Sequence, residues 1–252
     1  MLEQPLFDKL SQLRLGGVKE ALKDQMGSTK YDDLSFEERL GLLIDYELVQ
    51  REDRRLERRR KSAKFRDTGR IADLDMSASR GIDKKQILSL AQCIWVKEHL
   101  NLIITGATGV GKTYISSAIG YCACEKGFVV RYYKTSRLLD EIHSCHADGS
   151  WGKFLDKIAK VQLLILDDWF RDPLNSNETR NILEVFDDRW QTGSLILLSQ
   201  VPIENWHSRM EDPTLADAVL DRVIHNSYKL ELEGESQRKL KSKKRVEVNY
   251  ET

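Results

Sequence analysis

Hydrophobic positions in the first eighty residues recur at the spacing of amphipathic helices. Nearest the N-terminus, this spacing is seen at Leu6, Leu10, Leu13 and Val18. Ser35 followed by Glu38 matches a capping box, which predicts a longer helix over 36–64. The periodicity is lost over 65–82, so this segment is predicted to be a linker. The pattern therefore indicates a small all-α N-terminal domain over 1–80.

From residue 101 the pattern changes to short apolar runs that we predict to be strands, preceded by a helix over 83–98. The runs are NLIIT (101–105), FVVRYY (128–133), VQLLILDD (161–168), SLILLSQ (194–200) and SYKLEL (227–232). Their spacers, 20–35 residues long, suit crossover helices between parallel strands. The pattern thus predicts an α/β domain over 81–252 with a five-stranded parallel sheet flanked by helices.

A glycine-rich sequence that satisfies GxxxxGK[ST] follows the first strand and opens a helix. Such a loop turns its backbone N–H groups toward a polyphosphate at the positive end of a helix. Lys112 is expected to neutralise the β- and γ-phosphates of ATP, and the Thr113 hydroxyl to bind Mg²⁺. The predicted ATP-binding residues are Gly106, Ala107, Thr108, Gly109, Val110, Gly111, Lys112, Thr113 and the following Tyr114.

Two carboxylates end the third predicted strand. Paired acids at the end of a buried strand are costly to desolvate without a charge partner, and Mg²⁺ supplies one. Asp167 is predicted to lie in the metal shell, and Asp168 to orient or deprotonate the attacking water. The alternative is that the pair is an exposed strand end or a helix cap.

Three further features could complete a catalytic site. The fourth predicted strand ends in Ser199 and Gln200, either of which could point at the γ-phosphate. Arg222, in ADAVLDRVIHN, is predicted to act in trans on the γ-phosphate bound by a neighbouring chain. An arginine in that position can raise the rate of hydrolysis by several powers of ten. Arg238 is predicted to contact ATP in a sensing role; a role in cis is favoured, and a role in trans is the alternative. Both arginines could instead be ordinary surface residues.

The charge of the chain cancels, with 40 basic and 40 acidic residues, which excludes a globally basic nucleic-acid binder. The charge is unevenly placed, however, because 51–70 carries ten basic and four acidic side chains. The predicted DNA-binding residues are Arg51, Arg54, Arg55, Arg58, Arg59, Lys61 and Lys64. Arginine and lysine on a helix neutralise phosphates without reading bases, so we expect sequence-tolerant binding to double-stranded DNA. The alternative is a solvated helix with internal ion pairs.

The chain resembles the IstB-like ATP-binding family, AAA+ helper proteins of bacterial insertion sequences related to the DnaC loaders and DnaA initiators. The resemblance rests on YELVQREDRRLERRRKSAKF, GVGKT, LLILDDW, LLSQVP, DPTLADAVLDRVIHN and GESQRK, in this order. It implies an AAA+ core with a reduced or absent lid, and an ATP-dependent, DNA-binding homo-oligomer. The partner it implies is a cognate transposase, which the protein assists in target selection. The chain departs from the family's usual DD-Gly with Asp167-Asp168-Trp169.

Other functions remain open from the sequence. A DnaC-like helicase loader shares every nucleotide motif, and the arginine-rich helix favours the transposition helper. The sequence has no NKxD motif, which a GTPase would need to bind guanine. It also has no arginine-rich lid segment between the strands, which a small-molecule kinase would need. ATP as a structural switch without turnover is a further alternative. Four cysteines without a CxxC pair, no secretory signal and no apolar run of ~20 residues lead us to expect a cytoplasmic protein without a membrane partner.

Overall fold

The computed structural model describes residues 3–76, 81–237 and 239 of the chain. The chain divides into two units, Met1–Arg58 and Arg59–Thr252, with the division inside helix α3 (Phe36–Ala63). This division lies well before residue 80, where the sequence led us to expect it. The reason is that residues directly after Arg58 pack on the second unit: the Arg60 guanidinium lies 2.8 Å from the Glu125 carboxylate, and the Phe65 ring stacks on Tyr121.

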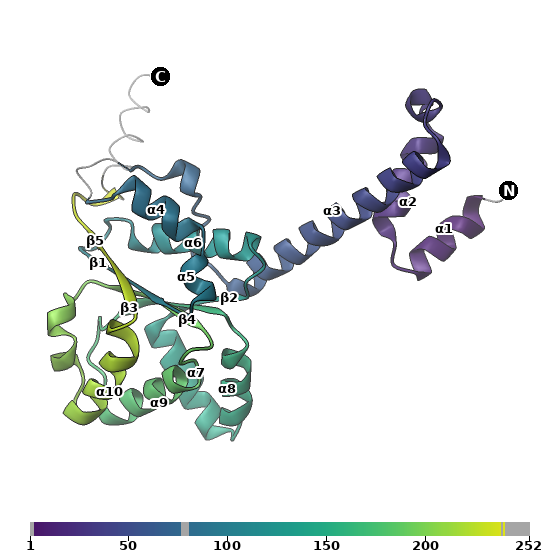
Figure 1. Ribbon diagram of the computed structural model, residues 1–252. Coiled ribbons are helices and arrows are strands. Elements are labelled where there is room, and N and C mark those ends of the chain that lie inside the picture. The colour runs from purple at the N-terminus through teal and green to yellow at the C-terminus, as the bar shows by residue number, and fades with distance from the viewer. Residues whose placement is uncertain (1–2, 77–80, 238, 240–252) are drawn as a thin grey trace, which may run out of the picture. The chain divides into compact units, whose positions relative to one another are not determined.

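The first unit is all-α, as predicted (Figure 1). It contains α1 (Glu3–Gln12), α2 (Gly16–Met26), the 3₁₀ turn η1 (Thr29–Tyr31) and most of α3. The capping box at the start of α3 is confirmed, because the Glu38 N–H donates to Ser35 Oγ at 3.2 Å and the Ser35 N–H donates to Glu38 Oε2 at 2.8 Å. The sequence signal therefore fixes the start of this helix to the residue.

A buried carboxylate on α3 caps the N-terminus of α2. Glu47 is 4% exposed and accepts hydrogen bonds from the N–H groups of Gly17 (2.6 Å) and Val18 (3.1 Å), groups that have no partner within their own helix. Burial raises the pKa of Glu47, but the Arg51 guanidinium and the two N–H groups outweigh it, so the pKa is lowered overall. The resulting stabilisation is present above the pKa of the unfolded chain and is lost as the pH falls through the folded pKa.

The second unit is built on a five-stranded parallel sheet, which confirms the predicted fold class. The strands are β1 (Asn101–Gly106), β2 (Val130–Lys134), β3 (Leu163–Trp169), β4 (Ser194–Ser199) and β5 (Ser227–Leu232). Their order is β2-β3-β4-β1-β5, so β3 and β4 separate β2 from β1. All strands run the same way, and the polar residues that end β1, β3 and β4 therefore meet at one edge of the sheet.

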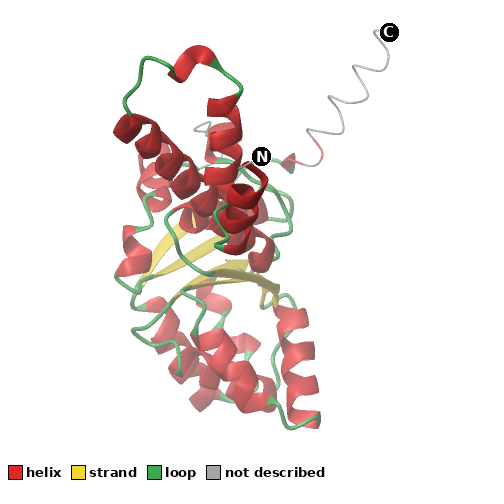
Figure 2. Cartoon of the chain, turned by 90° about the vertical axis from the view of Figure 1, so that its right-hand side faces the viewer, coloured by secondary structure: helices red, strands yellow, loops and turns green. Residues whose placement is uncertain are grey.

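Helices cover both faces of this sheet (Figures 1 and 2). One face carries α4 (Lys84–Ala91), α5 (Ile94–Lys97) and α6 (Lys112–Glu125). The other carries α7 (Thr135–Ala147), α8 (Trp151–Ala159), α9 (Ser176–Asp187) and α10 (Pro213–Ile224). Burial on both faces explains why the predicted strands are continuous apolar runs. The described residues include no helix with the length and apolar character needed to cross a bilayer.

Two local predictions are wrong. The helix over 83–98 is divided into α4 and α5, because Cys93 adopts a left-handed conformation (φ 56°) and the Trp95 indole N–H donates to the Leu90 carbonyl at 2.9 Å. The predicted linker contains the 3₁₀ turn η2 (Ile71–Asp73), which packs against α6. Two more 3₁₀ turns, η4 (Ile203–Asn205) and η5 (His207–Arg209), follow β4.

Candidate nucleotide-binding site

The glycine-rich loop connects the end of β1 to the start of α6, in the context that the motif requires. Gly106 ends β1 with φ 141°, and a Cβ atom there would overlap the Leu232 carbonyl oxygen on β5. Only glycine fits this close approach of two backbones. The loop then places Lys112 and Thr113 in the first turn of α6, where the helix N-terminus favours an anion.

The Lys112 side chain folds back onto the glycine-rich loop, where its ammonium group contacts main-chain carbonyls. Its Nζ donates to the carbonyl oxygens of Gly106 (2.6 Å) and Ala107 (2.9 Å), and the residue is 8% exposed. Burial lowers the pKa of Lys112, and the negative charges of Asp167 and Asp168 oppose this shift. The loop thus holds a cation at the helix N-terminus, which is the arrangement that binds a polyphosphate.

Thr113 and Asp167 form a pair of oxygen ligands suited to Mg²⁺. The Thr113 hydroxyl donates to Asp167 Oδ2 at 2.8 Å, although the two residues are 54 positions apart in the chain. Asp167 is 2% exposed, a position in which a carboxylate needs charge partners or hydrogen-bond donors. Hard oxygen donors of this kind are those that Mg²⁺ prefers, so the residues present fit the ion.

Asp168 faces the same site from an unusual backbone conformation. Its φ is 59°, its side chain is 24% exposed, and Oδ2 lies 3.1 Å from Lys134 Nζ at the end of β2. Trp169, at the position where the resembling family has glycine, is buried with its ring 4.5 Å from Phe170 and 6.4 Å from Trp206. The turn therefore directs Asp168 toward the site and Trp169 into the core.

The structure distinguishes between the two polar residues after β4. Ser199 is fully buried, and its hydroxyl donates to the Trp169 carbonyl at 2.8 Å, so this side chain joins β4 to β3 and does not reach the site. Gln200 Oε1 accepts a hydrogen bond of 2.6 Å from the Thr108 hydroxyl of the loop. Gln200 is therefore the polar side chain that could contact a γ-phosphate.

Lys112, Thr113, Asp168 and Gln200 line a cavity of ≈ 430 Å³, which Asp167 reaches only through its hydrogen bond with Thr113. The loop and α6 contribute Thr108, Gly109, Gly111, Lys112, Thr113 and Tyr114. Lys134, Asp168, Arg171, Gln200 and Gln237 complete the side formed by the strand ends and the segment after β5. The remaining predicted loop residues do not line it: Gly106 and Ala107 present their carbonyls to Lys112, and Val110 is buried.

Sequence reasoning missed one wall of this cavity. The segment predicted to be a linker supplies Arg66, Asp67, Asp73, Leu74 and Asp75. It is held against α6, since the Arg70 N–H donates to the Tyr114 hydroxyl at 3.2 Å and a Cβ atom on Gly69 would lie 2.6 Å from the Tyr114 carbonyl oxygen. The lost periodicity indicated irregular structure, but nothing local revealed that the segment packs beside the nucleotide loop.

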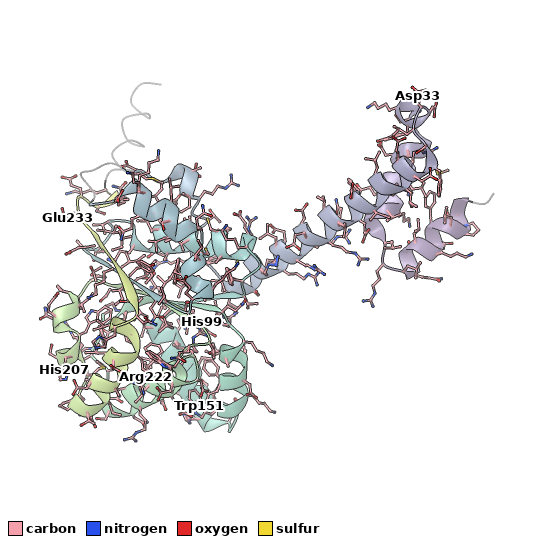
Figure 3. All side chains as sticks on the ribbon, in the orientation of Figure 1. Asp33, His99, Trp151, His207, Arg222 and Glu233 are labelled. Carbon is pink, nitrogen blue, oxygen red and sulfur yellow. The ribbon has the colours of Figure 1, made fainter. Side chains whose placement is uncertain are left out.

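Arg222, the predicted catalytic arginine, is not among the described residues that line the cavity. Arg222 on α10 lies on the opposite face of the sheet from α6 (Figure 3). Its guanidinium contacts Asp187 at 2.8 Å and Asp221 at 2.9 Å and lies over the ring of Trp190. Arg222 thus cannot serve the cavity of its own chain, and a role in catalysis requires a second chain. Arg238 lies outside the described residues.

The predicted DNA-binding residues lie on α3 or, for Lys64, directly after it, and most are exposed, but some of their charges are already paired within the chain. Arg51 is paired with the buried Glu47 at 2.6 Å, and Arg55 lies 3.6 Å from Glu52. Arg58 Nε donates to the Arg54 carbonyl, and Arg59 is only partly exposed. Exposed positions also include Arg54, Lys61 and Lys64. Part of the charge is therefore satisfied within the helix, as the solvated-helix alternative requires.

The parallel sheet, the loop and the Asp167 site define a P-loop nucleotide-binding protein of the AAA+ class. The chain belongs to the family described as IstB-like ATP binding protein, which matches residues 8–245. A Pseudomonas fluorescens protein named for ATP binding and for insertion sequence IS1162 is 45% identical over 203 residues, covering 80% of this chain and 88% of that protein. The insertion-sequence ATP-binding protein y4pL of Sinorhizobium fredii is 37% identical, covering 97% of this chain and 100% of that protein.

Solved structures resemble this chain in fold over two thirds to three quarters of its length. The crystal structure of DnaI has a TM-score of 0.57 at 19% identity and covers 66% of this chain and 91% of that one. AMPPCP-bound DnaA from Aquifex aeolicus has a TM-score of 0.57 at 17% identity, covering 75% of this chain and 58% of that one. At these identities the likeness establishes a shared AAA+ fold.

Proposed function

We propose that this protein is an ATPase that assembles on double-stranded DNA and assists the transposase of its insertion sequence. The observation that carries the proposal is the cavity lined by Lys112, Thr113 and Asp168, with the buried Asp167 hydrogen-bonded to Thr113 beside it. The names of its relatives, which join ATP binding to insertion sequences, support the link to transposition. We extend the proposal to target selection and transposase recruitment, and membership of this family supports that extension.

The chemistry assigns one task to each residue of the cavity. With ATP bound, Lys112 would leave the loop carbonyls for the β- and γ-phosphates, and Thr113 and Asp167 would hold Mg²⁺. The ion, when bound, offsets the charge that develops on the phosphates. Asp168 orients the attacking water or accepts its proton, and Gln200 contacts the γ-phosphate. Arg222 of a neighbouring chain completes the site, so hydrolysis depends on assembly.

Light scattering after size exclusion tests this function with a duplex of about 50 base pairs, long enough for several basic helices to neutralise phosphates at once. The protein is run without nucleotide, with ADP, with ATP and with a non-hydrolysable ATP analogue. We expect ATP and the analogue to produce a DNA-bound oligomer, and Lys112→Ala to form none because it lacks the phosphate-binding cation. If the protein remains monomeric and does not bind DNA in any of these nucleotide states, the proposal is contradicted. A replicative helicase is then the partner to test.

The salt dependence of DNA affinity tests the arginine-rich helix separately. Replacing Arg54 and Arg58 together by alanine is expected to weaken binding to all sequences alike. The slope of log affinity against log salt should fall by roughly 2, since each neutralised phosphate contributes about 0.9. Arg180→Ala, an exposed arginine on α9, serves as the control and should leave the slope unchanged. An unchanged slope in the double variant means that α3 is only a solvated helix.

A further inference from the structure

The carboxyl end of β2 is built around Asp167. Tyr132 is 7% exposed, and its hydroxyl donates to Asp167 Oδ2 at 2.6 Å. The Thr135 hydroxyl, at the start of α7, donates to the Asp167 main-chain carbonyl at 3.0 Å. β2 lies beside β3 with Lys134 in register with Asp167, which places residues near this strand end within reach of the carboxylate. Both contacts join residues more than thirty positions apart in the chain.

The hydrogen bonds of Asp167 account for nearly all of its acceptor capacity. Oδ2 accepts from both Tyr132 and Thr113, and Oδ1 accepts from the Asp168 N–H at 2.8 Å. An ionised carboxylate offers about four acceptor sites, so roughly one remains. With three donors in different directions, the carboxylate cannot rotate without breaking a short hydrogen bond in a buried environment.

We propose that Tyr132 is a positioning residue of the magnesium site, which holds the Asp167 carboxylate toward Thr113 and leaves one of its acceptor sites directed at the ion or its bound water. This inference rests on the proposed function, since it assumes that Thr113 and Asp167 bind Mg²⁺ together with ATP. Tyr132 touches neither the ion nor the nucleotide in this role. Its effect is transmitted through Asp167, as hydrogen-bond partners of metal ligands commonly act.

Tyr132→Phe removes the hydroxyl and keeps the ring that packs in the sheet. We expect the Mg²⁺ concentration that half-saturates binding of a non-hydrolysable ATP analogue to rise on the order of tenfold, as when the partner of a metal ligand is lost. Binding of the same analogue in EDTA should be unchanged, because Lys112 and the loop are intact. Titration calorimetry of the full chain at a series of Mg²⁺ concentrations measures both quantities without relying on turnover.

Tyr133→Phe is the matched control. Tyr133 is the next residue on β2, is 6% exposed, and belongs to the core cluster on the face covered by α7 and α8. The substitution removes the same atom from a neighbouring buried tyrosine but leaves Asp167 untouched, so the Mg²⁺ requirement should equal that of the wild type. Melting temperatures without nucleotide verify that both variants are folded.

The outcomes separate this inference from the function on which it rests. If the wild type binds no nucleotide, the proposed function fails. If the wild type binds with a clear Mg²⁺ dependence and Tyr132→Phe shows the same dependence, Tyr132 does not position Asp167 and only this inference fails. Equal shifts in Tyr132→Phe and Tyr133→Phe also overturn it, because the effect then belongs to the sheet and not to the Asp167 hydrogen bond.

Discussion

Arg222→Ala is expected to reduce ATP turnover of the assembled protein by roughly a thousandfold, the lower range for an arginine that stabilises the transition state of phosphoryl transfer. ATP binding by each chain should be unchanged, because Arg222 does not line the cavity of its own chain. The two ion pairs lost with Arg222 lie at a partly exposed site and are worth about 1 kcal/mol or less, so unfolding cannot account for such a loss. Steady-state ATPase assays with duplex DNA measure the effect.

A mixing experiment distinguishes a contribution in trans from a local defect. Arg222→Ala retains an intact cavity, and Asp168→Asn, which should still bind ATP and assemble, retains an intact Arg222. In a mixed oligomer, an interface between one chain of each variant can contain a complete catalytic site. The ATPase activity of the mixture should therefore exceed the sum of the activities of the two variants measured separately. Arg180→Ala is again the control for loss of an arginine. If mixing restores no ATPase activity and Arg222→Ala alone hydrolyses ATP normally, Arg222 is not catalytic and only forms its ion pairs with Asp187 and Asp221.

Asp168→Asn is expected to lower turnover by about a hundredfold or more, the usual contribution of a positioned general base. The amide is nearly isosteric but cannot accept a proton from water, while Lys112, Thr113 and Asp167 still bind Mg²⁺ and ATP. DNA-bound oligomers should consequently form with ATP and persist, where those of the wild type disassemble as ATP is consumed. Single-turnover hydrolysis and time-resolved light scattering follow the two events.

Asp156→Asn, an exposed residue on α8, controls for the change of charge and should behave as the wild type. Rapid hydrolysis by Asp168→Asn contradicts the assignment of the base. If the wild type assembles with ATP but does not hydrolyse it at a measurable rate, ATP acts as a structural switch.

Features that depend on neighbouring residues in the chain could be predicted from the sequence. The capping box at Ser35 and the loop leading to Lys112 are local patterns, and the five strands are apolar runs because both faces of the sheet are covered. The Asp167-Asp168 pair was assigned to the site because acids that end a buried strand need a partner. The parallel sheet itself follows from the length of the spacers.

Features that depend on contacts between distant residues could not be predicted in the same way. Gln200 meets Thr108 across 92 positions, which separates it from Ser199, whose hydroxyl turns back to β3. The predicted linker is a wall of the cavity because Gly69 allows it to approach α6. Such contacts produce no repeating pattern in the sequence, because each involves single polar residues or irregular segments that are far apart in the chain.

The sequence by itself determined that the chain has a helical N-terminal part, a parallel α/β sheet and a phosphate-binding loop, because helix and strand periodicities and the glycine spacing are set by backbone geometry over a few residues. Only the tertiary structure decided which side chains share the cavity, that Arg222 lies away from it, and that Tyr132 holds Asp167. The physical reason is that hydrogen bonds and ion pairs act over about 3 Å, and only the folded chain brings residues so far apart in sequence within that distance.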